Sequence, residues 1–194
     1  MKLILSSSDF GNPKSAQAIY NNLCMPVEKC KVLYFPNEKV TEAKLQSNKY
    51  YERLMHFGFL RENIIVFNYF APQVLITTQI DAVYISGGNT FGIMKFLRLS
   101  GADKLIVELV KSGAIYIGGS AGAHIASANI SHVAKYDIDT YGLTDFSGLG
   151  LFDGIIICHY CSDIFNDYKC LVEQNKYQVV KLSDEENLII ESIY

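Results

Sequence analysis

Short apolar runs alternate along the chain with amphipathic stretches whose apolar positions repeat at helical spacing. The short runs are rich in β-branched and aromatic side chains, which is typical of buried strands. They predict strands at residues 2–5, 31–35, 63–67, 82–85, 114–117, 154–158, 179–182 and 188–193. The amphipathic stretches predict helices at residues 15–24, 42–57, 72–78, 90–99, 102–111 and 121–128.

Strands that alternate with helices predict an α/β fold, a three-layer sandwich with a mostly parallel sheet between two layers of helices. No linker, low-complexity stretch or internal repeat divides the chain, so we expect one domain over residues 1–194. In a parallel sheet of this kind, ligands bind at the carboxyl ends of the strands. Residues that directly follow a predicted strand are therefore the first candidates for a functional site.

Composition narrows the class of protein. The chain is 49% hydrophobic and 19% charged, so it can bury a substantial core. Its net charge of −3, from 17 basic and 20 acidic residues, gives no reason to expect a nucleic acid or an anionic membrane as partner.

The first residues and the cysteines indicate where the protein works. The apolar run of the opening residues, MKLILSSSDFGN, is too short for a signal peptide and is typical of a strand. No apolar run approaches the roughly 18 residues that span a bilayer. The five cysteines are an odd number, which favours free thiols in a reducing compartment over a disulfide framework. We therefore expect a cytoplasmic protein.

The first chemical signal is the sequence Gly-Gly-Ser-Ala-Gly at residues 118–122. A G-x-S-x-G pattern between a buried strand and a helix of small residues is typical of a nucleophile elbow, which would expose the hydroxyl of Ser120 above the sheet. The backbone N–H of Ala121 would then face a developing oxyanion at a helix N-terminus. The alternative is an ordinary strand-to-helix turn in which Ser120 caps the helix.

A second glycine-rich turn, Ser-Gly-Gly-Asn-Thr, follows the predicted strand at residues 82–85. Gly87 and Gly88 would let a ligand approach the backbone closely, and the Gly88 N–H would be a second oxyanion donor. Asn89 would bind substrate through its amide. The alternative is that Asn89 caps the following helix.

A serine hydroxyl needs a general base to become a nucleophile. His159 directly follows the predicted strand at residues 154–158, which would bring it to the same sheet edge as Ser120. The other histidines are placed less favourably, in an upstream helix, on the helix of the elbow itself and in a loop: His56, His124 and His132. A carboxylate must orient the base, and chain order alone allows Asp137, Asp139, Asp145 or Asp153.

Residues 158–161, Cys-His-Tyr-Cys, form a C-x-x-C pattern. A redox motif of this type opens a helix after the first strand of a thioredoxin-like unit, and a zinc site needs two further ligands. Neither context is present here. We interpret Cys158 and Cys161 as buried thiols that flank a functional His159.

Three segments together resemble the peptidase E family, the S51 serine peptidases that include aspartyl dipeptidase and cyanophycinase. They are YISGGNTFGIMKFL, GAIYIGGSAGAHIAS and GLGLFDGIIICHYC, at residues 84–97, 113–127 and 148–161. The resemblance implies a class I glutamine amidotransferase-like (flavodoxin-like) fold with a serine in place of the cysteine. It also implies roles for individual residues: Ser120 as nucleophile, His159 as base, Asp137 as acid with Asp139 in reserve, Gly88 and Ala121 as oxyanion donors, and Gly87 and Asn89 at the substrate.

The function that we expect is hydrolysis of a peptide bond near the N-terminus of dipeptides or short peptides, without a metal or an organic cofactor. Aspartate is one candidate for the residue before that bond. The family holds the substrate aspartate with a cation, usually an arginine after the base. Here no arginine follows Arg98, and Lys169 is the nearest cation after His159. We expect a short peptide as the partner and a monomer or homodimer. Two alternatives are an esterase that uses the same Ser-His pair and a non-catalytic amidotransferase-like binding protein.

Overall fold

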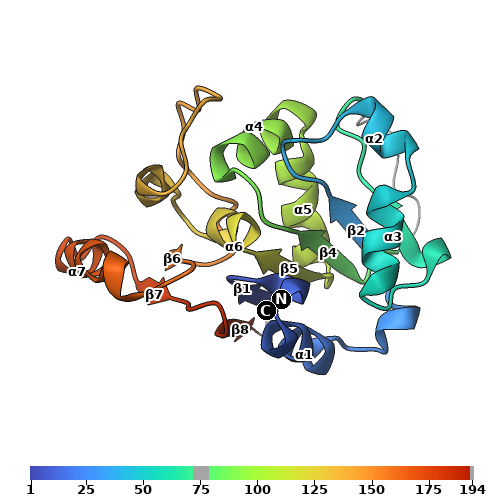
Figure 1. The fold of residues 1–194 in the computed structure, drawn as a ribbon, viewed down its shortest axis with the longest axis horizontal. Coiled ribbons are helices and arrows are strands. Elements are labelled where there is room, and N and C mark those ends of the chain that lie inside the picture. The colour runs from blue at the N-terminus through green and yellow to red at the C-terminus, as the bar shows by residue number, and fades with distance from the viewer. Residues whose placement is uncertain (72–78, 193–194) are drawn as a thin grey trace.

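A six-stranded sheet forms the centre of the molecule, in the strand order β3-β2-β4-β5-β1-β8 (Figure 1). The structure is a computed structural model that describes residues 1–71 and 79–192. The strands of this sheet are β1 (Lys2–Ser6), β2 (Val32–Phe35), β3 (Ile64–Val66), β4 (Ala82–Ile85), β5 (Ile115–Gly119) and β8 (Asn187–Glu191). All neighbours run parallel except β8, which is antiparallel to β1.

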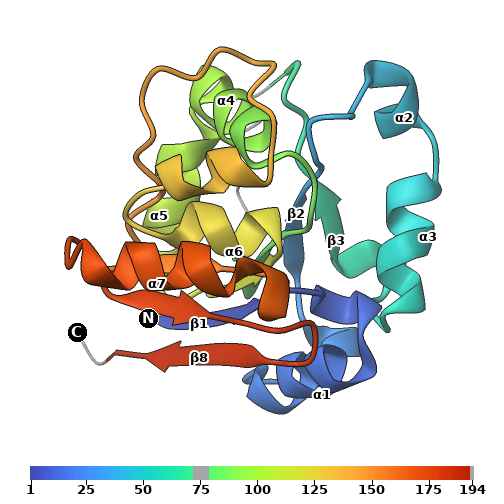
Figure 2. The same cartoon turned by 60° about the vertical axis from the view of Figure 1, so that its left-hand side comes forward.

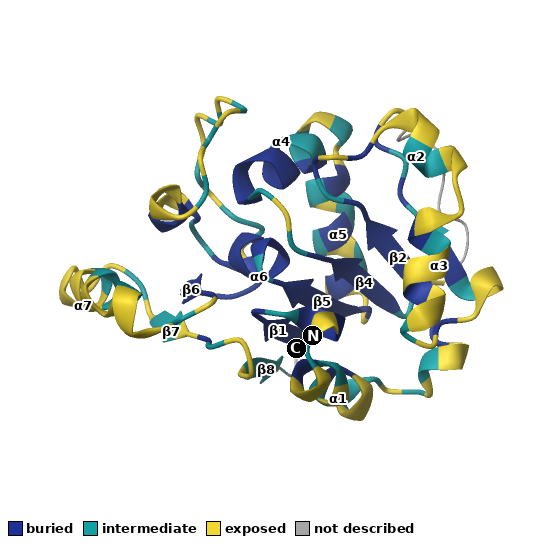
Figure 3. Cartoon of the chain, in the orientation of Figure 1, coloured by how far each residue is buried: buried dark blue, intermediate teal, exposed yellow. Residues whose placement is uncertain are grey.

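Helices cover both faces of the sheet, which confirms the predicted α/β sandwich. The helices are α1 (Pro13–Asn22), α2 (Glu42–Gln46), α3 (Lys49–His56), α4 (Thr90–Ser100), α5 (Ala102–Lys111), α6 (Ala121–Ala126) and α7 (Phe165–Glu173). Figure 2 shows α1 and α3 on one side of the sheet, and α4, α5 and α6 packed together on the other. The strands β4 and β5 and the helix α6 are buried at every residue (Figure 3).

The sheet order brings the two glycine-rich turns together. β4 pairs with β5 so that Ile85 lies opposite Gly118, and each strand is followed at once by its turn. The two turns therefore leave the carboxyl edge of the sheet side by side. Their positions agree with the sequence prediction because both strands are fully buried and begin and end at sharp changes of polarity.

Two predictions about helices differ from the structure. The single helix expected at residues 42–57 is split into α2 and α3, because Ser47 takes an extended conformation and its hydroxyl donates to the Lys44 carbonyl. The helix α7 was not predicted, and none of its residues is buried. The helix expected at residues 72–78 lies outside the described residues.

Two further strands, β6 (Ile155–Ile157) and β7 (Val179–Lys181), form a separate two-stranded parallel sheet. The sequence predicted both strands but placed the strand before His159 in the same sheet as the elbow. That prediction was wrong because β8 returns antiparallel and takes the free side of β1. With α7, this small sheet forms a lobe beside the main sheet (Figure 1). Consequently, contacts other than the ladder of the main sheet must bring His159 to the elbow.

The elbow is packed too tightly for any side chain at Gly122. A Cβ atom there would lie 2.1 Å from the carbonyl oxygen of Ile85 in β4. We expect Gly122→Ala to lower the free energy of unfolding by about 3 kcal/mol, at the upper end of what overpacking costs, because backbone cannot move aside easily. Urea unfolding checks this. Gly11→Ala is the control, since a Cβ there would have its nearest contact at 3.9 Å, and equal midpoints for the two variants would contradict the expectation.

Candidate active site

Ser120 sits on a strained turn between β5 and α6. Its backbone has φ 50° and ψ −111°, a conformation that a residue with a side chain rarely adopts and that surrounding contacts must hold. Its N–H donates to the carbonyl of Ser6 (2.9 Å), at the end of β1. This is the geometry of a nucleophile elbow, and it lifts the hydroxyl of a half-buried residue towards solvent.

The Ser120 hydroxyl lies 3.0 Å from Nε2 of His159. The other ring nitrogen, Nδ1, lies 2.5 Å from Oδ1 of Asp184. Because a carboxylate only accepts, Nδ1 carries the proton, and Nε2 is then free to accept from the hydroxyl of Ser120. The side chains of His159 and Asp184 are 52% and 63% exposed, so solvent and a ligand can reach both. The serine and the histidine singled out in the sequence are thus brought together.

Asp137, the residue expected to orient His159, lies elsewhere. Its Oδ2 accepts from the Thr90 N–H (2.8 Å) at the start of α4. The reserve residue, Asp139, accepts from the backbone N–H groups of Tyr141 and Leu143 and so braces its own loop. Neither makes the contact with His159 that Asp184 makes.

The position of Asp184 has a topological cause. It follows β7, and β7 pairs with β6, so the two strands carry Asp184 and His159 out of the small sheet together. The carboxylates that chain order favours lie between Ser120 and His159, whereas Asp184 follows both. The available signal was an acidic residue two positions beyond the strand predicted at residues 179–182.

The second glycine-rich turn lies directly against the elbow. A Cβ atom on Gly87 would be 3.3 Å from the Cβ of Ser120, so the two turns touch. Asn89 is not aimed at the site: its Oδ1 caps α4 by accepting from Gly92 N (2.9 Å), and its Nδ2 donates to the carbonyl of Ile138. The helix-capping alternative therefore describes Asn89.

Ala121 directly follows Ser120, and Gly88 lies in the neighbouring turn and lines the same cavity as Ser120. Within the described residues, no hydrogen bond uses the backbone N–H of Gly88 or of Ala121. The turn at Gly88 is fixed from behind, because Oε2 of the buried Glu38 accepts from Asn89 N (2.9 Å). Two free donors on rigid turns next to a hydroxyl are what an oxyanion-binding site requires.

A cavity of about 400 Å³ opens at these groups. Its lining comes from both turns, from α6 and the segment after it, and from the segment between β6 and α7: Gly88, Ser120, His124, Tyr136, Asp137, Cys158, His159 and Ile164. The lining includes a carboxylate but, within the described residues, neither lysine nor arginine. Tyr136 is fixed in the wall by its hydroxyl, which donates to Asp167 in α7 (3.2 Å).

The thiol next to His159 is not prepared for nucleophilic attack. Burial raises the pKa of Cys158 to about 12, and the nearby Asp184 carboxylate adds to that rise. A thiol attacks as the thiolate, so Cys158 stays protonated and unreactive near neutral pH. Of the C-x-x-C pair, Cys158 is buried as predicted, but Cys161 is exposed, and both are free. No group of three potential metal ligands occurs among the described residues.

His124 is neutral. Burial lowers its pKa to about 3, and the neighbouring His132 and His159 add to the effect. An unfolded histidine has a pKa near 6.5, so between pH 6.5 and 3 the unfolded chain binds a proton that the folded chain does not. Stability from this group is complete above pH 6.5 and falls with pH, by about 1.4 kcal/mol per unit.

We therefore expect His124→Gln to unfold with a weaker dependence on acid than the unmodified protein. Urea midpoints measured at pH 7, 6 and 5 give the two slopes. Burial also lowers the pKa of His132, which acts in the same direction in both proteins, so the comparison isolates His124. Identical slopes would contradict a neutral, buried His124.

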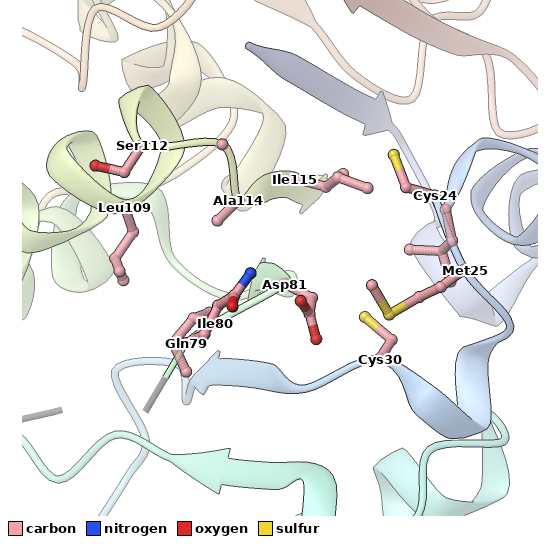
Figure 4. Close-up of a pocket in the computed structure, with 12 residues that line it drawn as sticks. Cys24, Met25, Cys30, Gln79, Ile80, Asp81, Leu109, Ser112, Ala114 and Ile115 are labelled. Atoms are coloured by element: carbon pink, nitrogen blue, oxygen red, sulfur yellow. The ribbon is translucent and has the colours of Figure 1, made fainter. Parts of the chain in front are cut away.

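A second cavity, of about 440 Å³, lies at the opposite end of the sheet (Figure 4). Asp81 and Ile115 in its wall stand at the amino ends of β4 and β5, far from the two turns. Its thiols come from Cys24 and Cys30, and burial raises the pKa of Cys30 to about 12. Among the described residues, no histidine lines this cavity, so it holds no counterpart of the Ser120–His159 pair.

The model of the family described as Peptidase family S51 matches residues 2–192. The chain belongs to peptidase family S51. An uncharacterised peptidase of Listeria monocytogenes is 37% identical over 59% of this chain and 60% of its own length. The peptidase E of Citrobacter koseri is 35% identical over 51% of this chain and 42% of its own length. The chain thus spans about two fifths to three fifths of the length of these curated relatives.

Solved structures show the same S51 fold. A Listeria monocytogenes EGD-e protein described as a candidate peptidase E superposes with a TM-score of 0.72 and 26% identity, over 97% of this chain and 93% of that one. A peptidase from an acI-B1 actinobacterium gives a TM-score of 0.59 at 14% identity, over 97% and 82%, which is a likeness of fold. In the described part of this S51 chain, no helix is long and apolar enough to cross a membrane.

Proposed function

We propose that this chain is a serine peptidase that hydrolyses a peptide bond near the N-terminus of short peptides. The observation that carries the proposal is the hydrogen-bonded series Ser120–His159–Asp184 on a strained elbow. Serine, histidine and a carboxylate in this order are the parts of a catalytic triad. Family membership adds peptide bonds as the class of substrate.

In the proposed reaction, Ser120 Oγ attacks the carbonyl carbon while Nε2 of His159 removes the hydroxyl proton. Asp184 keeps the proton on Nδ1 and stabilises the imidazolium. The N–H groups of Gly88 and Ala121 donate to the oxyanion. His159 then gives its proton to the amide nitrogen, the C–N bond breaks, and an acyl-enzyme remains. A water molecule, deprotonated by His159, then attacks the ester carbonyl carbon. His159 returns that proton to Ser120 Oγ as the ester C–O bond breaks, which releases the acid product and restores the free serine.

The cavity indicates which peptides fit best. Its volume suits a ligand of the size of a short peptide. Asp137 in its wall would pair with the free amino group of a substrate N-terminus. A substrate aspartate would find no cation among the described lining residues, and Lys169 lies next to Glu173 (3.7 Å) on α7. We therefore propose that uncharged residues are preferred over aspartate before the scissile bond.

A fluorophosphonate probe tests the nucleophile, and mass spectrometry of the labelled peptide locates it. We expect one label, on Ser120. The substrate is tested with dipeptides that begin with alanine, leucine or aspartate, and each dipeptide is compared with its N-acetylated form. Turnover of p-nitrophenyl esters is measured alongside, to compare ester with peptide hydrolysis. We expect free dipeptides that begin with alanine or leucine to be hydrolysed faster than free dipeptides that begin with aspartate. Folded protein that takes no label would favour a binding protein, and turnover of esters alone would favour an esterase.

A further inference from the structure

The segment that carries His159 needs support from outside its own sheet. β6 ends at Ile157, and His159 then takes φ 55°, a left-handed conformation that is uncommon for a residue with a side chain. Such a conformation persists only when surrounding contacts hold it. Because β6 is not part of the main sheet, no backbone ladder ties this segment to the elbow.

Two successive backbone N–H groups in this segment donate to side chains. The N–H of Cys158 donates to Nε2 of His124 (3.3 Å), and the N–H of His159 donates to Oγ of Ser7 (3.0 Å). Both acceptors are buried, with exposures of 6% for His124 and 1% for Ser7. Removing either acceptor would leave a backbone donor without a partner at the turn that aims His159, which costs more than the bond itself is worth.

The same two acceptors come from segments that hold Ser120. Ser7 directly follows Ser6, whose carbonyl accepts from Ser120 N (2.9 Å). His124 lies one turn along α6, and its own N–H donates to the carbonyl of Ser120 (3.0 Å). The backbone of Cys158 and His159 is therefore hydrogen-bonded to the same two segments that fix the backbone of Ser120.

Each acceptor is held in one orientation. The Ser7 hydroxyl donates to the carbonyl of Leu182 (2.9 Å), so its lone pair faces His159 N–H. Nε2 of His124 must accept from Cys158 N–H, so Nδ1 carries the proton and donates to Oγ1 of Thr90 (3.3 Å). His124 is thereby fixed as one neutral tautomer between the base segment and the start of α4.

We propose that Ser7 and His124 are positioning residues for the base of this peptidase: they hold the backbone of Cys158 and His159 so that Nε2 of His159 meets the Ser120 hydroxyl. This inference rests on the proposed function, because His159 is taken as the base. Ser7 and His124 themselves touch neither the reacting bond nor its proton.

Three variants separate positioning from packing. Ser7→Ala removes the acceptor for His159 N–H, and His124→Leu removes the acceptor for Cys158 N–H. His124→Gln keeps an acceptor near the position of Nε2. Ser15→Ala is the control for Ser7→Ala, because Ser15 is a fully buried serine in α1 whose hydroxyl has no partner among the described residues.

We expect Ser7→Ala and His124→Leu to slow fluorophosphonate labelling and to lower kcat by about 10- to 100-fold, the size of effect that a misplacement of about 1 Å produces. In Ser7→Ala, KM should stay within about threefold, because Ser7 is not part of the lining of the substrate cavity. His124→Gln should recover most of the loss, and Ser15→Ala should match the unmodified protein. NMR of the ¹³C-labelled His159 ring should show a changed environment in Ser7→Ala and not in Ser15→Ala.

Labelling and kcat within twofold of the unmodified protein in both loss variants would overturn the inference. So would an effect confined to KM, or equal losses in His124→Leu and His124→Gln, which would mean packing alone. If His124→Leu does not fold, Ser7→Ala decides. A failure of the proposed function has a different signature, because the unmodified protein would then take no label. The His159 signal in Ser7→Ala would still test the positioning contact.

Discussion

Ser120→Ala is expected to lower kcat by about 10⁴- to 10⁶-fold and to abolish fluorophosphonate labelling. Removal of the nucleophile of a serine triad typically costs this much, because the remaining parts can only bind and polarise the substrate. The fold should be unaffected, since alanine meets the same backbone strain at φ 50° and, within the described residues, the hydroxyl forms its hydrogen bond with the exposed His159. Steady-state hydrolysis of a dipeptide and a urea unfolding curve measure the two effects.

Ser112→Ala is the matched control. Ser112 lines the cavity at the opposite end of the sheet, so its hydroxyl has no part in the chemistry at Ser120. We expect this variant to keep the activity and the labelling of the unmodified protein. Retained dipeptide hydrolysis in Ser120→Ala would remove Ser120 from the mechanism, and loss of activity in Ser112→Ala would point to the other cavity.

The central part of the fold was predictable because local pattern and burial agree there. β4 and β5 are apolar at every position up to the end, are buried throughout, and stop at glycine-rich turns. Their parallel pairing then brings Gly87 and Ser120 together without further information. For the same reason, Ser120 could be singled out from its turn alone.

The remaining parts depend on pairings between distant residues, which a local pattern does not carry. Whether β6 joins the main sheet or pairs with β7 depends on where β8 returns, and short apolar runs are compatible with either arrangement. The pairing of β6 with β7 also determines which carboxylate contacts His159. Asp137 satisfied chain order but is held at Thr90, and the residue beyond β7 reached His159 instead.

The contacts of His159 make Asp184→Asn the second variant with a large expected effect. Asparagine keeps the shape of the side chain but can donate through its amide. It can then hold the ring with the proton on Nε2, and that nitrogen could no longer accept from Ser120. We expect kcat to fall by about 10²- to 10⁴-fold, with the smaller figure favoured by the exposure of Asp184. The proton NMR signal of His159 Nδ1–H, which the contact with the Asp184 carboxylate should shift strongly downfield, should be lost in Asp184→Asn.

Asp137→Asn separates the two carboxylates. Its amide oxygen can still accept from Thr90 N–H, so the turn at α4 should survive, whereas the negative charge in the cavity is lost. If that charge holds the amino group of the substrate, KM should rise by about 10-fold or more, since hydrogen bonds to charged groups contribute about 1.5–3 kcal/mol, while kcat changes little. Hydrolysis of the N-acetylated dipeptide should be unaffected by Asp137→Asn, because that substrate has no free amino group for the Asp137 carboxylate to hold. The reverse pattern, with kcat lost in Asp137→Asn and kept in Asp184→Asn, would return the orienting role to Asp137.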